Sequence, residues 1–201
     1  MTENIAFFDF DGTVTNRDTL FEFIRFTKGT AACYLGFLRY SPLVLAYKLK
    51  LVSNQAAKEA VLRHFFKGTP IATLNDACKR FEKVILPGMI RPGALQEIIQ
   101  LKNEGFEIVI VSASPENWIC GWAAGIGAAL IGSRLEIVEG RVTGNLVDKN
   151  CHGEEKVCRI KEKYRLTDYK KIYAYGDTTG DRPMLALATT AFYKPFREGT
   201  V

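Results

Sequence analysis

An apolar run near the N-terminus ends in two aspartates and a glycine, and this feature limits the fold more than any other in the chain. Residues 5–10 are apolar except for Asp9, and Asp11 and Gly12 follow directly. Because side chains alternate along a β-strand, a strand over this run places Asp9 and Asp11 on one side and the phenylalanines beside them on the other. The sequence therefore predicts a buried strand whose end presents two carboxylates.

Carboxylates this close repel each other and resist joint ionisation. A fold tolerates the pair most easily when a divalent cation neutralises both carboxylates or when one of them keeps a proton. Gly12 lets the backbone turn sharply and come close to a ligand. Carboxylate oxygens suit a hard cation such as Mg²⁺, with phosphate chemistry beside it. Two aspartates that only cap a turn are the alternative, which the apolar strand before them disfavours.

The second half of the chain alternates between strand and helix patterns. Helices are predicted over 92–104, 115–124, 153–164 and 182–188, and strands over 106–111, 171–175 and 190–193, with a strand and a hairpin over 130–147. This alternation predicts an α/β fold, a three-layer, doubly wound parallel sheet with crossover helices. The stretch 18–84 is helical throughout, so we expect a cap domain over 15–86 inserted into a core of 1–14 and 87–201.

Polar side chains follow the predicted strands at the sites where such sheets bind ligands. Ligands bind outside the carboxyl ends of parallel strands, and there Ser112 follows one strand while Asp177 and Asp181 follow another. Lys156 lies in the first turn of a predicted helix, where the helix dipole disfavours a lysine. A phosphate explains that placement, because a lysine neutralises the charge of a transferring phosphoryl group.

The two N-terminal aspartates fit two chemical roles. Asp9 is the candidate nucleophile, since a carboxylate attacks phosphorus to form an aspartyl phosphate. Asp11 is the candidate general acid for the leaving oxygen, and then the general base for the water that cleaves the intermediate.

These four segments together resemble the motifs of the haloacid dehalogenase (HAD) superfamily of phosphohydrolases. Residues 9–13 resemble its first motif, Ser112 its second, Lys156 its third and residues 176–181 its fourth. The helical insert is similar to the cap of the phosphoserine-phosphatase-like subfamily, IB. Asp11 is absent from the dehalogenase branch of the superfamily, so the resemblance implies phosphate chemistry, a HAD Rossmann-like core and Mg²⁺ as the cofactor.

The resemblance also implies a role for each matched residue. The Mg²⁺ ligands are Asp9, the backbone carbonyl of Asp11, and Asp177, and Asp181 supports this metal shell. The phosphoryl group is held by the Ser112 hydroxyl, the backbone at Ala113 and the Lys156 ammonium. The implied function is a Mg²⁺-dependent phosphomonoester hydrolase with a phospho-aspartate intermediate, acting on a small or amphiphilic metabolite.

The substrate is left open by the residues around these motifs. Asp18 stands where phosphoserine phosphatases carry a glutamate that contacts the substrate, and residues 113–116 replace their glycine pair. The run 150–157 looks more like the branch that contains the C-type phosphatidylglycerophosphatases. Phosphoserine hydrolysis, phosphate transfer to another metabolite, and a catalytically silent Mg²⁺- or phosphate-binding module remain the alternatives.

Composition narrows the cellular setting. The net charge of +5 helps to attract anionic substrates. The basic residues form no block and no recognition motif, so the sequence does not indicate nucleic-acid binding. The five cysteines form no CxxC pair and predict free thiols in a reducing cytoplasm. The adjacent Cys151 and His152 lack a second ligand pair for zinc, and no signal peptide is recognised at the N-terminus.

The segment 33–52 is apolar enough to raise the question of a membrane. It contains Arg39, Lys48 and Lys50 and is interrupted by Pro42, which argues against a spanning helix. A packed face of the helical insert is one interpretation. Peripheral contact with lipid of the inner membrane, or binding of an acyl chain, is the other.

Overall fold

The computed structural model describes residues 3–43, 49 and 51–197. Its centre is a parallel five-stranded sheet in the order β3-β2-β1-β6-β7. The strands are β1 (Asn4–Phe8), β2 (Phe106–Pro115), β3 (Ala129–Ser133), β6 (Lys171–Gly176) and β7 (Thr190–Tyr193). The chain leaves central β1 toward β2 on one side and later returns to β6 on the other, so the predicted doubly wound α/β fold is confirmed.

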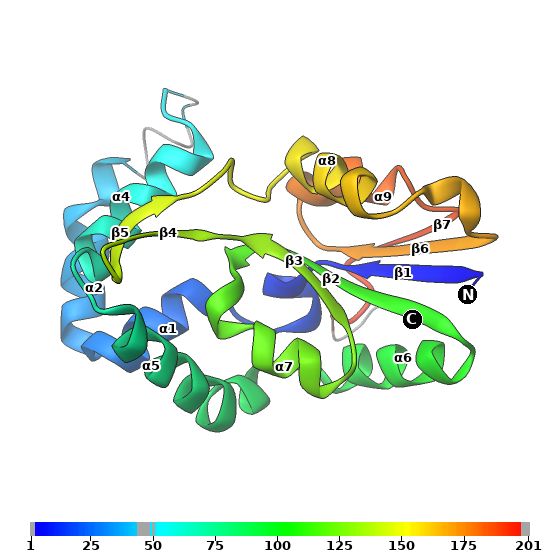
Figure 1. Ribbon diagram of the computed structural model, residues 1–201, viewed down its shortest axis with the longest axis horizontal. Helices are drawn as coiled ribbons and strands as arrows, with labels where there is room; N and C mark the ends of the chain where they lie inside the picture. Colours follow the sequence, from blue (N-terminus) through cyan, green and yellow to red (C-terminus); the bar gives the residue numbers. More distant parts are fainter. Residues whose placement is uncertain (1–2, 44–48, 50, 198–201) are drawn as a thin grey trace.

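Helices cover both faces of this sheet (Figure 1), namely α6 (Pro92–Asn103) and α7 (Cys120–Gly125) on one and α8 (Glu154–Lys163) and α9 (Arg182–Leu185) on the other. Alternation along β1 divides its apolar side chains between two core clusters. Ala6 and Phe8 pack in the cluster that includes residues of α6, and Ile5 and Phe7 pack in the cluster that includes residues of α8. Burial on both faces explains why the strand is almost wholly apolar.

The predicted first strand was two residues too long. β1 ends at Phe8, and Phe10–Val14 form a kinked turn in which Asp11 is extended and Gly12 takes a φ of 87°. The turn breaks the strand alternation, so the expectation that the Asp9 and Asp11 side chains point together was wrong. Phe10 still joins Phe8 in one core cluster, as predicted.

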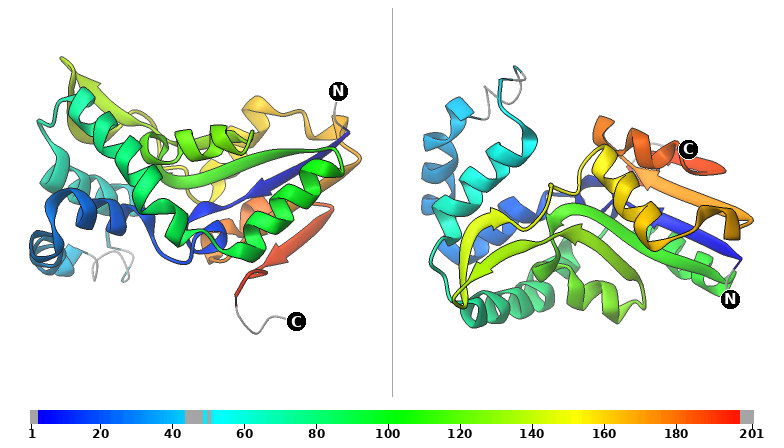
Figure 2. Two further views of the ribbon diagram at one scale, coloured as in Figure 1. Left: turned by 90° about the horizontal axis from the view of Figure 1, so that it is seen from below. Right: turned by 45° about the horizontal axis from the view of Figure 1, so that its top comes forward.

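The insert between β1 and α6 is helical, as predicted, over the residues that the structure describes. It contains α1 (Thr19–Lys28), α2 (Thr30–Arg39), α4 (Asn54–Phe66) and α5 (Ile71–Val84). Ser53 caps α4 by accepting a hydrogen bond from the Ala56 N–H at 3.1 Å, which confirms the helix start expected there. These helices gather at one end of the molecule in each view (Figures 1 and 2). Of the apolar segment 33–52, residues 44–48 and 50 lie outside the described part.

The predicted hairpin is formed by β4 (Leu135–Val138) and β5 (Arg141–Leu146). Its turn contains Glu139 and Gly140, both with positive φ. The hairpin lies beside α4 (Figure 2), with the Leu146 N–H donating to Glu59 Oε1 at 3.2 Å. Residues beyond the predicted cap range therefore pack on the helical insert, and the domain limits remain a prediction. All five cysteines are free, as predicted.

Candidate active site

The sheet brings the predicted site residues to one edge. Asp9 directly follows β1, Ser112 lies in the last part of β2, and Asp177 directly follows β6. Since β1 lies between β2 and β6, these residues meet where the chain reverses its direction of winding. The Asp9 N–H donates to the Tyr175 carbonyl in β6 at 2.9 Å, which fixes the backbone at this point.

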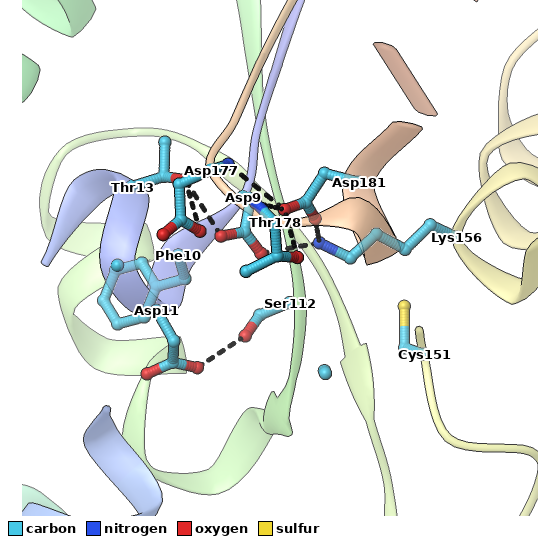
Figure 3. A network of polar contacts seen from close by, with 12 residues as sticks. Asp9, Phe10, Asp11, Thr13, Ser112, Cys151, Lys156, Asp177, Thr178 and Asp181 are labelled. Carbon is cyan, nitrogen blue, oxygen red and sulfur yellow. Dashed lines mark hydrogen bonds and ion pairs between the residues drawn. The ribbon is translucent and has the colours of Figure 1, made fainter. Parts of the chain in front are cut away.

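Lys156 is buried at the centre of the site between two carboxylates (Figure 3). Its Nζ lies 2.6 Å from Asp9 Oδ1 and 2.7 Å from Asp181 Oδ1. Burial alone disfavours the ammonium, but the two carboxylates outweigh burial and raise the pKa of Lys156 above its ordinary value. A lysine in the first turn of α8 therefore stays charged next to the candidate nucleophile, as its unusual position suggested.

The two carboxylates that contact Lys156 differ in their ionisation. Burial raises the pKa of Asp9 to about 7 against the opposing effect of Lys156. Burial also acts on Asp181, but Lys156 and hydrogen bonds from Thr178 outweigh it and hold the pKa of Asp181 below its ordinary value. Asp9 thus needs further positive charge to stay ionised near neutral pH, which a bound cation would supply.

Asp9, Asp177 and Asp181 offer carboxylate oxygens that all lie within 4.8 Å of one another, and all three residues are buried. This all-oxygen set fits a hard cation such as Mg²⁺. Asp181 Oδ1 accepts from Lys156, and its Oδ2 alone accepts three hydrogen bonds, from the Thr178 N–H at 2.9 Å, the Thr178 hydroxyl at 2.8 Å and the Asp177 N–H at 3.2 Å. Asp181 is therefore suited to support the cation site, while Asp9 and Asp177 are suited to ligate the ion.

Two residues of the kinked turn after β1 complete this side of the site. A Cβ atom at Gly12 would lie 2.6 Å from Asp177 Oδ2, so only glycine lets the turn approach that carboxylate. The Thr13 hydroxyl lies 3.0 Å from Asp9 Oδ2 and 3.5 Å from Asp177 Oδ1 (Figure 3). Thr13 was not predicted as a site residue, although its place in the first motif was a signal for it.

Asp11 points away from the carboxylate cluster and toward β2 (Figure 3). Its Oδ1 accepts the Thr19 N–H at 2.7 Å, and its Oδ2 accepts the Ser114 hydroxyl at 2.6 Å and lies 3.4 Å from the Ser112 hydroxyl. The Asp11 carboxylate thus lies beside Ser112, the predicted phosphate contact. Ser114 was missed in the sequence, yet its spacing of two from Ser112 places both on one face of the strand.

A cavity of about 230 Å³ lies at this site and is lined by Asp9, Asp11 and Lys156, among other residues. The remaining predicted site residues, Asp18 and Ala113, line it too. Asp18 is exposed and caps α1 by accepting the Phe21 N–H at 2.9 Å. The Ala113 carbonyl accepts a hydrogen bond from Lys58 Nζ at 2.9 Å. A larger surface hollow of about 690 Å³ elsewhere contains none of the candidate catalytic residues.

Two cations near the site were not predicted. Lys58 reaches the cavity from α4, and Arg197 Nη2 lies 2.8 Å from Asp177 Oδ2. Both belong to segments without a recognisable motif, so only the folded chain reveals them.

Comparison with known proteins identifies the family of the chain. The sequence profile of the haloacid dehalogenase-like hydrolases matches residues 6–186. The chain belongs to this family. It is 36% identical over 192 residues to Protein CicA of Caulobacter vibrioides, covering 94% of this chain and 85% of CicA. It is 29% identical to Phosphoserine phosphatase SerB1 of Mycobacterium tuberculosis, covering 92% of this chain and 63% of SerB1.

Solved structures share the fold. A Bordetella pertussis protein of unknown function superposes with a TM-score of 0.81 at 22% identity, covering 95% of this chain and 89% of that one. A substrate-bound phosphoserine phosphatase superposes with a TM-score of 0.64 at 21% identity, covering 96% of this chain and 86% of that one. The predicted family and the prediction of a phosphatase are confirmed. Within the described residues, none of the helices has the length and apolar character needed to cross a membrane.

Proposed function

We propose that this phosphatase is a Mg²⁺-dependent phosphomonoesterase that transfers the phosphoryl group to Asp9 before releasing it to water. The observation that carries the proposal is the buried group of Asp9, Asp177 and Asp181 with Lys156 between two of its members. This group brings together a candidate nucleophile, Asp9, carboxylate oxygens that can ligate a hard cation, and the positive charge of Lys156. The test is phosphate release from an aryl phosphate with Mg²⁺ and with a chelator, and release in the chelator at the full rate would reject the metal requirement.

The proposed reaction uses Asp9 and Asp11 in turn. An Asp9 oxygen bonds to the substrate phosphorus while the bond from phosphorus to the leaving oxygen breaks, and Asp11 gives its proton to that oxygen. Asp11 then takes a proton from a water molecule that attacks the phospho-aspartate, which frees phosphate and restores Asp9. Lys156 and Ser112 hold the phosphoryl oxygens. Mg²⁺, held by Asp9, Asp177 and the Asp11 carbonyl, would neutralise their charge.

The substrate in this proposal is a small phosphate ester. The name of the relative SerB1 favours phosphoserine, whereas the departures at Asp18 and residues 113–116 favour another metabolite, soluble or amphiphilic. A panel of phosphorylated metabolites that includes phosphoserine and phosphatidylglycerol phosphate separates these candidates. Adding an alcohol acceptor and looking for its phosphate ester separates hydrolysis from phosphotransfer. Mg²⁺-dependent phosphate release above background would remove the alternative of a silent binding module.

Stabilisation of the protein by Mg²⁺ is expected to depend on pH. Burial raises the pKa of Asp9 to about 7, so metal-free folded protein takes up a proton as the pH falls through that value, and a protonated carboxyl is a poor ligand. We expect Mg²⁺ to raise the melting temperature clearly at about pH 8 and much less at about pH 5. Equal shifts at both pH values in thermal melts would contradict the assignment of Asp9 as a ligand.

We further propose that α2 contacts the surface of anionic membranes. The helix buries Cys33 and Gly36 and exposes Tyr34, Leu35 and Leu38, whose exposed fractions are 57%, 66% and 69%. Leucine and tyrosine next to a cation, here Arg39, are typical of interfacial helices.

The double variant Leu35→Ser/Leu38→Ser is expected to lower binding to phosphatidylglycerol vesicles by about tenfold or more, since each buried leucine contributes roughly 1.5–3 kcal/mol. Sedimentation with vesicles measures the effect. If the wild-type protein and the double variant bind the vesicles equally well, this face of α2 has another role.

A further inference from the structure

Asp177 has a cationic partner that the reaction described above does not use. Arg197 lies in the segment after β7, and its Nη2 atom lies 2.8 Å from Asp177 Oδ2. The side chain of Asp177 is 6% exposed, whereas that of Arg197 is 46% exposed. The guanidinium therefore contacts a buried carboxylate from the solvent side of the site.

The segment that carries Arg197 is held on the core by the end of β6. The Phe196 ring stacks on the ring of Tyr175, with 5.6 Å between the two centroids. The Lys194 N–H donates a hydrogen bond to the Gly176 carbonyl at 2.8 Å. Tyr175 and Gly176 are the last two residues of the strand that ends at the site. These contacts fix the backbone of Arg197 relative to the carboxylate that its side chain contacts.

The two oxygens of the Asp177 carboxylate have different surroundings. Oδ2 accepts the hydrogen bond from Arg197, whereas Oδ1 lies 3.5 Å from the Thr13 hydroxyl. The same hydroxyl lies 3.0 Å from Asp9 Oδ2, so Oδ1 is the Asp177 oxygen on the side of the candidate nucleophile (Figure 3). An aspartate carboxylate has a broad range of torsion angles about its last bond. A hydrogen bond that holds one oxygen therefore also sets the direction of the other.

The contact also completes the charge balance of the candidate cation site. Among the described residues, Lys156 pairs with Asp9 and Asp181, and Arg197 pairs with Asp177. A positive charge beside a cation site repels the cation, but the guanidinium is half exposed and water screens its charge. The orientation of the ligand acts at contact distance, where no water intervenes. We therefore expect orientation to outweigh repulsion.

We infer that Arg197 is a positioning residue that holds Asp177 Oδ2 and leaves Oδ1 to ligate Mg²⁺. The inference rests on the proposed function and concerns how the chain prepares its metal site. Carboxylates that ligate metals are held by such outer hydrogen bonds, and loss of one typically weakens metal binding by about 10- to 100-fold. A half-exposed ion pair contributes little to the stability of the fold, so the two roles are separable.

Titration calorimetry with Mg²⁺ in the absence of substrate tests the inference. We expect Arg197→Met to weaken Mg²⁺ binding by about tenfold or more, with a melting temperature in chelator close to that of the wild-type protein. Arg197→Lys, which keeps a charged donor, should recover part of the affinity. Arg182→Met removes an exposed arginine next to Asp181 in the sequence and should leave Mg²⁺ binding unchanged.

Mg²⁺ binding by Arg197→Met that equals or exceeds that of the wild-type protein overturns the inference, since the guanidinium would then only repel the ion. An equal loss in Arg182→Met overturns it too, because the contact with Asp177 would not be the cause. If Arg197→Met melts lower than the wild-type protein in chelator, Arg197→Gln, which keeps a neutral donor, takes its place. Undiminished Mg²⁺ binding by folded Arg197→Gln and Arg197→Met alike rejects the role of the contact.

The titration needs no turnover, so it distinguishes failure of this inference from failure of the proposed function. Weaker Mg²⁺ binding by Arg197→Met supports the inference even where the wild-type protein forms no phospho-aspartate. Mg²⁺-dependent phosphate release by a wild-type protein whose Mg²⁺ affinity is unchanged in Arg197→Met rejects the inference and leaves the proposed function intact. Because a positioning residue acts through the ion, saturating Mg²⁺ should bring the kcat of Arg197→Met close to the wild-type value.

Discussion

Asp9→Asn is expected to reduce the turnover of phosphomonoesters by about 10⁴-fold or more while the protein stays folded, because an amide oxygen does not replace the attacking carboxylate. The side chain keeps its shape, so the amide oxygen can still accept the hydrogen bond from Lys156, and the amide NH2 group then faces the Thr13 hydroxyl, which can accept from it. Lys156 also retains Asp181 at 2.7 Å. Removing one charge from three buried carboxylates relieves repulsion, and the melting temperature should not fall.

Steady-state hydrolysis of 4-nitrophenyl phosphate with Mg²⁺ measures the loss. Covalent labelling adds a direct readout, since the wild-type protein should form a hydroxylamine-sensitive phosphoprotein from a labelled substrate and Asp9→Asn should form none. Asp168→Asn, a change at an exposed aspartate of the core, is the matched control and should behave as wild type. Activity of Asp9→Asn near the wild-type level would reject the phospho-aspartate mechanism.

The positions of the main strands along the chain and the polar residues that follow them were predictable because both depend on local sequence. A buried parallel strand needs a continuous apolar run, and β1, β2 and β6 each show one before a polar residue. The convergence of Asp9, Ser112 and Asp177 then follows from the rule that parallel strands share one carboxyl edge.

The path of the chain just after β1 was not predictable by the same reasoning. Strand alternation predicted that the Asp9 and Asp11 side chains point the same way, but β1 ends before them and Asp11, in the kinked turn with the positive φ of Gly12, contacts Ser114 instead. Glycine signals a turn without specifying which one. Asp9 and Asp11 nevertheless line the same cavity, so the turn changes the hydrogen-bond partners of Asp11 without removing it from the site.

The cap side of the site was beyond local reasoning for a different reason. Lys58 occupies an ordinary helical position in α4, and its contact with Ala113 joins residues 55 apart in the chain. Such contacts depend on how the cap packs over the sheet, which periodicity does not report. The close packing of the β4–β5 hairpin on α4 is a contact of the same kind.

Lys156→Met is expected to lower both turnover and stability, because it removes the cation shared by two buried carboxylates. Removing one partner of a buried ion pair costs about 3–5 kcal/mol. Lys156 is 1% exposed and contacts both Asp9 and Asp181, so no water replaces it easily. Loss of the charge beside the nucleophile should also reduce kcat by about 10³-fold, as for other electrostatic groups at a transition state.

The stability deficit of Lys156→Met should shrink as the pH falls. The folded-state pKa of Lys156 is raised, so its stabilising effect on the wild-type protein is complete below the ordinary lysine value of 10.5 and constant through neutral pH. In the variant, burial and mutual repulsion raise the pKa values of Asp9 and Asp181. A carboxyl with a raised folded-state pKa contributes stability at low pH that is lost as the pH rises through that pKa.

Urea unfolding in the presence of a chelator at about pH 8 and about pH 5 measures this change, with the larger difference from wild type at the higher pH. Lys161→Met, an exposed position on the same helix, is the control and should leave the free energy of unfolding within about 0.5 kcal/mol of wild type. A deficit that is equal at both pH values would show that lost packing, rather than two unpaired carboxylates, limits the variant. A deficit that is larger at the higher pH would show that Asp9 and Asp181 are left unpaired in the variant. These are the charges that Lys156 balances in the proposed catalysis.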